Sequence, residues 1–94
     1  MDFEAFNSSL EHEVPPISLT VQLEALWYDG KGQWEKAHDL INDLTDNQSA
    51  HVHAYLHRKE GDLWNADYWY RRAGQQRPAT TLEEEWRALV KRLL

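Results

Sequence analysis

The feature that most constrains the fold of this chain is an internal repeat at an offset of 29 residues. When Gly61 is superimposed on Gly32, small residues fall on small residues and large apolar residues mostly fall on large ones. The aligned pairs are Ala25 with Ala54, Trp27 with Leu56, Trp34 with Leu63, Ala37 with Ala66, Leu40 with Trp69, Ile41 with Tyr70 and Leu44 with Ala73. Each unit is typical of two helices that approach closely at alanines, with large side chains filling the groove on either side. A single hairpin cannot cover its own apolar face, so we expect the two units to stack.

The segment from Gly61 to Gly74 carries the clearest helix signals. The Asp62 carboxylate can accept a hydrogen bond from a free backbone N–H, which predicts a helix N-cap. Gly74 can adopt the left-handed conformation that ends a helix, and Arg71 and Arg72 suit the negative end of the helix dipole. Helical periodicity predicts one buried stripe, made of Leu63, Ala66, Tyr70 and Ala73.

Local signals elsewhere predict further helices and no strand. We expect helices over residues 2–10, 18–29, 33–44, 50–60 and 81–94. The expected N-caps of three of them are Asp2, Ser18 and Ser49. Thr81 and Glu84 are expected to form a capping box at the start of the last helix. Pro15 and Pro16 break the chain before the second helix. The sequence therefore predicts a single all-α domain, 1–94. Its expected parts are a short N-terminal helical segment (1–17), a first hairpin (18–45), a second hairpin (49–74) and a C-terminal capping helix (80–94).

Composition narrows the classes of function. The formal net charge is −6, which disfavours nucleic-acid binding unless basic residues cluster. The chain has no cysteine, so disulfides and thiolate metal ligands are excluded. No apolar run reaches the roughly 20 residues of a membrane span, and the N-terminus lacks the pattern of a signal peptide. We expect a cytoplasmic protein that binds no nucleic acid, no membrane and no cofactor.

The repeat resembles the tetratricopeptide repeat, in which a small residue and an aromatic residue in the first helix are followed by Ala-x₃-aromatic in the second and then by proline. The first unit matches at Ala25, Tyr28, Gly32, Ala37 and Ile41, and the second at Ala54, Gly61, Ala66, Tyr70, Ala73 and Pro78. The similarity covers residues 18–78. It departs from the family in its period, which is about 34 residues there, and in Val21 and Ala50, where the family favours tryptophan.

The resemblance implies a concave peptide-binding groove lined by the first helix of each hairpin. Carried over to this sequence, its exposed residues are Leu19, Gln22, Leu26, Asp29, His51, Tyr55, Arg58 and Lys59. Tyr55, Arg58 and Lys59 could hold an acidic peptide or a terminal carboxylate through charge-assisted hydrogen bonds. The alternative is an ordinary solvated face. On this basis we expect a small module that binds a protein or peptide partner.

A second candidate is a polar pocket. Glu24 and His53 occupy equivalent positions in the two hairpins, where the family favours leucine, and His57 lies one turn after His53. With Tyr28 nearby, these residues predict a ligand pocket or a metal site with Glu24, His53 and His57 as ligands. The alternative is that the side chains are partly exposed or hydrogen-bonded for structure. His38 falls on the other helix of the hairpin and is not grouped with them.

A third candidate is an aromatic interface. Tyr68, Trp69 and Tyr70 are consecutive, so they cannot all face the core of one helix. The alternatives are that the C-terminal helix covers them or that Tyr68 and Trp69 form a homodimer surface. No set of nucleophile, base and orienting group can be assembled from this sequence, so we do not expect an enzyme.

Overall fold

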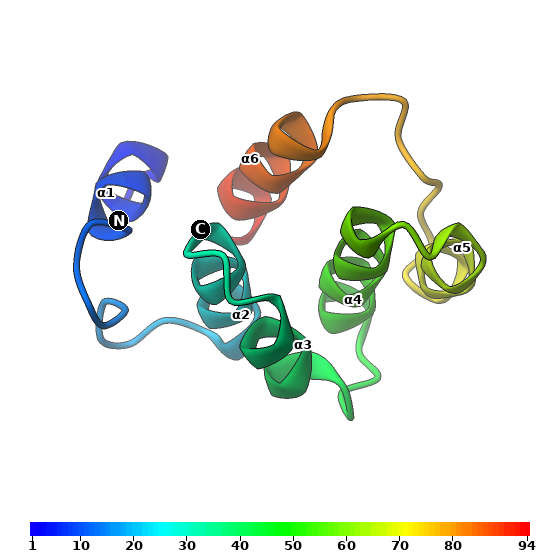
Figure 1. Cartoon of the computed structure of the whole chain (residues 1–94), viewed down its shortest axis with the longest axis horizontal. Coiled ribbons are helices and arrows are strands. Elements are labelled where there is room, and N and C mark those ends of the chain that lie inside the picture. The colour runs from blue at the N-terminus through cyan, green and yellow to red at the C-terminus, as the bar shows by residue number, and fades with distance from the viewer.

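The computed structural model describes residues 1–94 and contains six helices and no strand (Figure 1). The helices are α1 (Phe3–Ser9), α2 (Val21–Gly30), α3 (Trp34–Ile41), α4 (Asn47–Glu60), α5 (Leu63–Arg72) and α6 (Leu82–Leu93). The all-α prediction is therefore confirmed. None of the six helices has the length and apolar character that crossing a bilayer demands.

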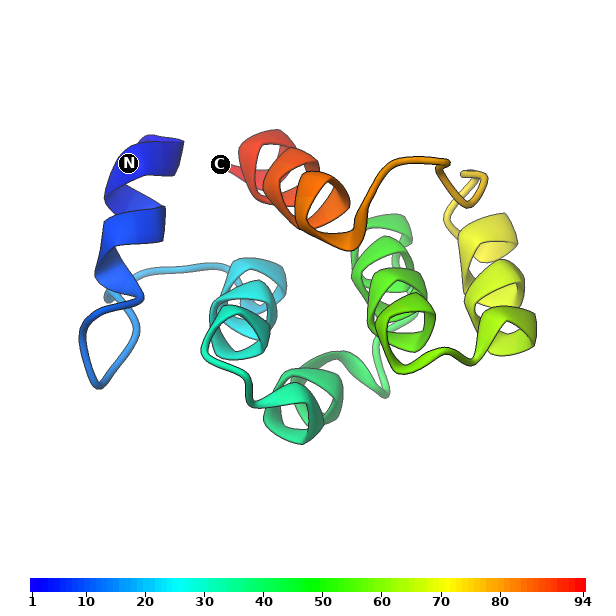
Figure 2. The ribbon, with the colours of Figure 1, turned by 45° about the horizontal axis from the view of Figure 1, so that its top comes forward.

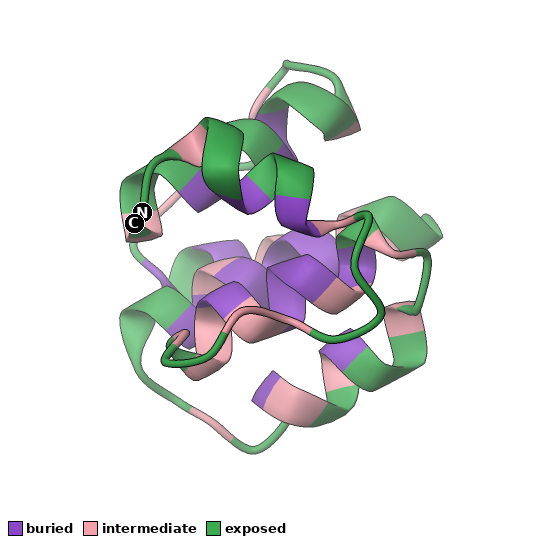
Figure 3. Ribbon diagram, turned by 90° about the vertical axis from the view of Figure 1, so that its left-hand side faces the viewer, coloured by how far each residue is buried: buried purple, intermediate pink, exposed green.

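The helices pack around α4. Successive helices pack as α2 with α3 and α4 with α5, and α4 also contacts α2, α3 and α6. The C-terminal helix α6 returns across α2 and α4, and α1 packs against α6 beside them (Figure 2). Buried residues concentrate on the facing sides of the central helices, and exposed residues lie around the outside (Figure 3). Helix α4 is consequently covered by four other helices.

The alanines of the repeat lie at the helix contacts, as predicted. Ala25, Ala37, Ala54 and Ala66 are all fully buried. A methyl side chain lets the backbones of two packed helices come close, which larger residues would prevent. Tyr70 and Ala73 are also buried, but Leu63, the first residue of the predicted stripe, is 41% exposed. Leu63 lies in the first turn of α5, beyond the surface that α4 covers.

Trp86 joins α6 and α1 to the rest of the core. Its indole Nε1 donates a hydrogen bond of 2.9 Å to the Leu26 carbonyl on α2. The Phe3 and Phe6 rings of α1 each lie 6.0 Å from its ring, centroid to centroid. Trp27 on α2 donates from Nε1 to the Ser9 Oγ at 3.0 Å. Aromatic side chains with one polar atom thus connect both termini to α2.

Most of the predicted helix ends are present. Asp2 and Asp62 accept from backbone N–H groups of α1 and α5, and Thr81 with Glu84 forms the capping box of α6. Gly74 has a positive φ of 72°, as a helix-ending glycine should.

Two predicted caps are wrong. Thr20, not Ser18, caps α2 through its side-chain oxygen. Ser18 instead has a positive φ of 68°, whereas an N-cap residue needs an extended backbone. Asp46, not Ser49, caps α4, and its carboxylate accepts from the Ser49 N–H at 3.0 Å. Because the helix starts earlier, Ser49 is a buried helical residue.

The helix predicted over 33–44 is shorter than expected. It ends at Ile41, before Asn42 and Asp43. Side chains of this type compete for backbone hydrogen bonds and favour helix ends. Leu44 nevertheless packs on the core from the following turn.

The turn after α4 provides a test of backbone strain. Gly61 has φ of 90°, and a Cβ at this position would meet no atom within 4 Å. We expect Gly61→Val to lower the free energy of unfolding by about 1–2 kcal/mol, because the Cβ of an L-residue clashes with the backbone in the left-handed conformation. Gly61→Asn, which tolerates that conformation, is the control and should cost less. Urea denaturation measures both, and equal stability of Gly61→Val and wild type would contradict the assignment.

Candidate metal centre

The groove predicted from the repeat is occupied by the protein's own C-terminal helix. Of the expected exposed residues, Leu26, Asp29 and Tyr55 are all at most 2% exposed. The Trp86 hydrogen bond to the Leu26 carbonyl shows that α6 lies on this face. The prediction that these residues line an open groove is therefore wrong, because α6 covers the surface that stacked hairpins would present to a peptide.

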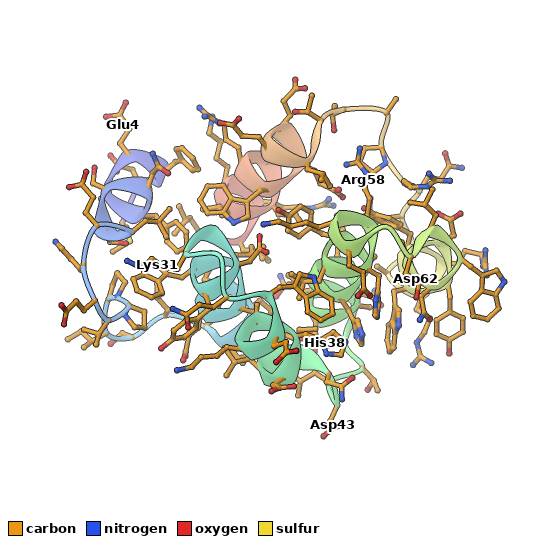
Figure 4. All side chains as sticks on the ribbon, viewed as in Figure 1. Glu4, Lys31, His38, Asp43, Arg58 and Asp62 are labelled. Atoms are coloured by element: carbon orange, nitrogen blue, oxygen red, sulfur yellow. The ribbon has the colours of Figure 1, made fainter.

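Arg58 and Lys59, the predicted peptide-binding cations, bind carboxylates of the same chain. Arg58 lies between α4 and α6 (Figure 4). It donates to the Glu85 carboxylate at 2.8 Å and also contacts the Thr80 carbonyl. Lys59 donates to Asp29 at 2.9 Å. Both cations thus hold helices together, and neither is free for an acidic peptide.

Two tyrosines complete these ion pairs. The Tyr55 hydroxyl donates to Asp29 at 3.0 Å, and the Tyr70 hydroxyl donates to Glu85 at 2.6 Å. Burial, followed by the adjacent carboxylate, raises the pKa of both hydroxyls. Both tyrosines therefore stay protonated and donate to buried carboxylates, which would otherwise be costly to desolvate.

The remaining groove residues do not converge. The Gln22 amide donates to the Ser49 Oγ at 2.9 Å, linking α2 to the first turn of α4. His51 is half-buried on α4, with its ring centroid 6.0 Å from that of Tyr70. Leu19 is partly buried and packs on the core.

The predicted polar pocket is only half present. Glu24 makes no hydrogen bond or ion pair with His53, and the Tyr28 ring packs under the Lys36 ammonium, 4.3 Å from its nitrogen. His53 and His57, in contrast, do lie together, with ring centroids 4.8 Å apart. Glu24 and Tyr28 lie on α2. The helix that brings a histidine to His53 and His57 is α3.

His38 takes the place expected for Glu24. Its Nε2 lies 3.1 Å from the Nε2 of His53. One ring nitrogen from each of His38, His53 and His57 lies within 4.8 Å of the other two. Figure 4 shows His38 on α3, next to α4. We name His38, His53 and His57 the histidine cluster.

Two tryptophans hold the rings of the histidine cluster. The Trp34 ring stacks on His38 with centroids 4.9 Å apart and planes 10° apart. The Trp69 ring stacks on His53 with centroids 3.9 Å apart and planes 15° apart. The Trp34 indole is itself fixed by a 2.7 Å hydrogen bond to the Leu56 carbonyl. Trp69 is partly buried, and the face of its ring that stacks on His53 is covered by α4.

Glu60 orients the third histidine. Its carboxylate lies 2.6 Å from the Nδ1 of His57, which leaves Nε2 as the nitrogen that can ligate. A carboxylate that binds one imidazole nitrogen sets the tautomer and makes the other nitrogen more basic, as in many zinc sites. Asp62, at the start of α5, also lies within 4.8 Å of His57 and Glu60, counted between potential ligand atoms. The histidine cluster therefore has an acidic side.

The electrostatics keep His38 and His53 in the form that binds metal. Burial, followed by the neighbouring His57 and His38, lowers the pKa of His53 from 6.5 to about 3. Burial and then His57 also lower the pKa of His38. Both imidazoles are consequently neutral at pH 7, and a neutral imidazole has a free lone pair for a cation.

Hydrogen bonds within the protein do not satisfy the cluster. His53 is 2% exposed, and its Nδ1 has no hydrogen-bond partner. Leaving a buried polar atom unpaired costs about 1–3 kcal/mol, and native structures rarely keep one without a functional reason.

A signal for His38 was present in the sequence. Trp34, Ala37 and Ile41 form the predicted buried stripe of α3, and His38 lies one turn after Trp34. This spacing puts His38 at the edge of the buried face, where α4 packs. Only the rotation of α3 against α4 decides that it meets His53.

Comparison with protein-family models, with curated proteins and with solved structures finds no match to this chain. The resemblance to the tetratricopeptide repeat accordingly stays a prediction.

The buried histidines predict acid sensitivity in the metal-free protein. Burial, and then Arg92, lowers the pKa of His51 from 6.5 to about 4. The unfolded chain takes up this proton near pH 6.5, whereas the folded chain does so near pH 4, so the free energy of unfolding should fall as the pH is lowered between these values. His51→Gln should reduce this loss, and His12→Gln, which removes an exposed histidine, should not. Urea denaturation at a series of pH values measures the slope, and an unchanged slope in His51→Gln would refute the prediction.

Proposed function

We propose that this protein is a metal-binding helical domain in which His38, His53 and His57 hold one divalent transition-metal ion between α3 and α4. The observation that carries the proposal is the approach of three histidines from two helices, with one ring nitrogen of each within 4.8 Å of the other two. Burial favours the neutral, metal-binding form of His38 and His53. The metal would bind the Nε2 atoms of His38 and His53 in place of the hydrogen bond between them.

The separation of the first two ligands supports this proposal. Two imidazole nitrogens bound to one tetrahedral zinc ion at about 2.0–2.1 Å are roughly 3.3 Å apart. The Nε2 atoms of His38 and His53 are already 3.1 Å apart, joined by a hydrogen bond that a metal ion would replace. The third nitrogen, from His57, lies within 4.8 Å of both.

The ligand set favours Zn²⁺, Ni²⁺ or Cu²⁺ over harder ions. Imidazole suits these metals, whereas Mg²⁺ and Ca²⁺ prefer sets made of oxygen ligands. Three protein ligands leave a fourth tetrahedral position for water or another small ligand. His38 is half-buried, so the site has one side close to solvent.

Metal-dependent stability tests the proposal. We expect excess Zn²⁺ to raise the melting temperature of the wild type, because a ligand at 100 times its Kd adds about 2.7 kcal/mol to the folded state. His38→Gln and His53→Gln should remove most of this rise. Quenching of tryptophan fluorescence by Cu²⁺ gives a second reading, since Trp34 and Trp69 stack on two of the ligands.

Glu24→Gln is the matched control, because it removes the ligand that the sequence suggested and leaves the histidine cluster intact. It should respond to Zn²⁺ as the wild type does. The proposal fails if millimolar Zn²⁺, Ni²⁺ and Cu²⁺ leave the wild-type melting temperature unchanged. It also fails if His38→Gln keeps the full rise.

A further inference from the structure

The two ends of the molecule carry exposed apolar residues that no other helix covers. On α5, Trp64 is 78% exposed, and Leu63 and Tyr68 are exposed beside it. In the segment between α1 and α2, Ile17 is 92% exposed and Val14 is 70% exposed. Large exposed side chains grouped in this way mark interaction sites in folded proteins.

These two groups face away from each other. The molecule measures 34 Å along its longest axis, and α5 lies at one end of that axis while α1 and the segment that follows it lie at the other (Figure 1). One copy of the chain therefore cannot bring the two groups together.

The aromatic face is the exposed side of α5. We give this name to Leu63, Trp64, Tyr68, Arg71 and Arg72, of which Trp64, Tyr68 and Arg72 follow one another at four-residue spacing. Arg72 donates to the Tyr68 hydroxyl at 3.1 Å, and its guanidinium lies over the Tyr68 and Trp69 rings.

The charge of the aromatic face is positive. Neither Arg71 nor Arg72 has a carboxylate within 4.0 Å. The acidic residues of this end are engaged elsewhere: Asp67 with Arg77, Asp62 in the cap of α5 and Glu60 with His57.

The opposite end presents the complementary chemistry. The proline segment, residues 11–17, reads Glu-His-Glu-Val-Pro-Pro-Ile. Glu11 and Glu13 are exposed and have no cation within 4.0 Å. Pro15 and Pro16 have fixed φ angles and no N–H groups, a combination that docks on aromatic surfaces with little loss of entropy.

The start of the proline segment is also held in place before any partner arrives. The Lys31 ammonium donates to the carbonyls of Leu10 at 2.6 Å and His12 at 2.8 Å. A segment that is already fixed loses less conformational entropy on binding than a free chain.

We propose that the proline segment of one copy docks on the aromatic face of a second copy, so that the chain associates head to tail. Val14 and Ile17 cover Trp64 and Tyr68, while Glu11 and Glu13 face Arg71 and Arg72. Such a contact uses two different surfaces, so it either closes into a ring or continues from copy to copy. This head-to-tail contact differs from the two-fold contact through Tyr68 and Trp69 that the sequence suggested.

Sedimentation velocity at increasing protein concentration tests this contact, with EDTA present so that histidine-bound metal cannot bridge two copies. The wild type should form species larger than a dimer, because every copy has both surfaces. Trp64→Ser and Ile17→Ser should each remain monomeric, while Leu94→Ser, which removes another exposed apolar residue, should behave as the wild type. Circular dichroism confirms that the variants are folded.

The decisive experiment mixes the two monomeric variants in equal amounts. Trp64→Ser keeps an intact proline segment, and Ile17→Ser keeps an intact aromatic face, so the mixture should form a dimer and nothing larger. A symmetric α5 dimer would instead let Ile17→Ser associate as well as the wild type, which would overturn the proposal. A wild type that stays monomeric at millimolar concentration, or a mixture no larger than its components, would also overturn it.

A charge exchange provides an independent reading. Glu13→Arg alone and Arg72→Glu alone should each weaken association, because like charges then face each other across the contact. The double variant should associate more strongly than either single one. If the double variant is as weak as both, the acidic and basic residues do not face each other and the proposed orientation is wrong.

Discussion

The structure depends on the burial of α4, which four other helices contact. From Ser49 to His57 this helix has a single residue that is not buried, the half-buried His51. Its sequence is nevertheless rich in polar groups, including His53, Tyr55 and His57. Because water cannot reach most of them, each needs a partner on a neighbouring helix. The helices α2, α3, α5 and α6 are largely positioned so that they provide these partners.

Two of the neighbouring helices provide carboxylates as partners for the polar groups of α4. Asp29 on α2 binds Tyr55 and Lys59, and Glu85 on α6 binds Arg58 and Tyr70. Buried ion pairs add little net stability, because both charges must first be desolvated. Their geometry is nevertheless restrictive, since a shift of α6 along α4 would leave charges unpaired. Together with the Trp86 hydrogen bond to α2, these pairs explain why the last helix lies in the groove instead of capping the end of the repeat.

The histidine cluster is the part of the α4 surface where a buried polar atom has no hydrogen-bond partner within the chain. His38 reaches His53 from α3, and Glu60 reaches His57, but the Nδ1 of His53 remains without a partner. This local deficit distinguishes the cluster from the two carboxylate networks, in which the buried oxygens are hydrogen-bonded. It lies between α3, α4 and α5, so a bound ion would join parts of both repeat units.

The helices, most of their ends and the buried alanines could be predicted from the amino-acid sequence. Asp62, Thr81 with Glu84 and Gly61 act within one or two turns of the chain, so their effects can be derived from neighbouring residues. The sequence did not predict that α6 fills the expected groove or that His38, not Glu24, meets His53. Both outcomes depend on how each helix is rotated about its axis and how helices cross. Those angles are set by many contacts at once, so no local pattern encodes them.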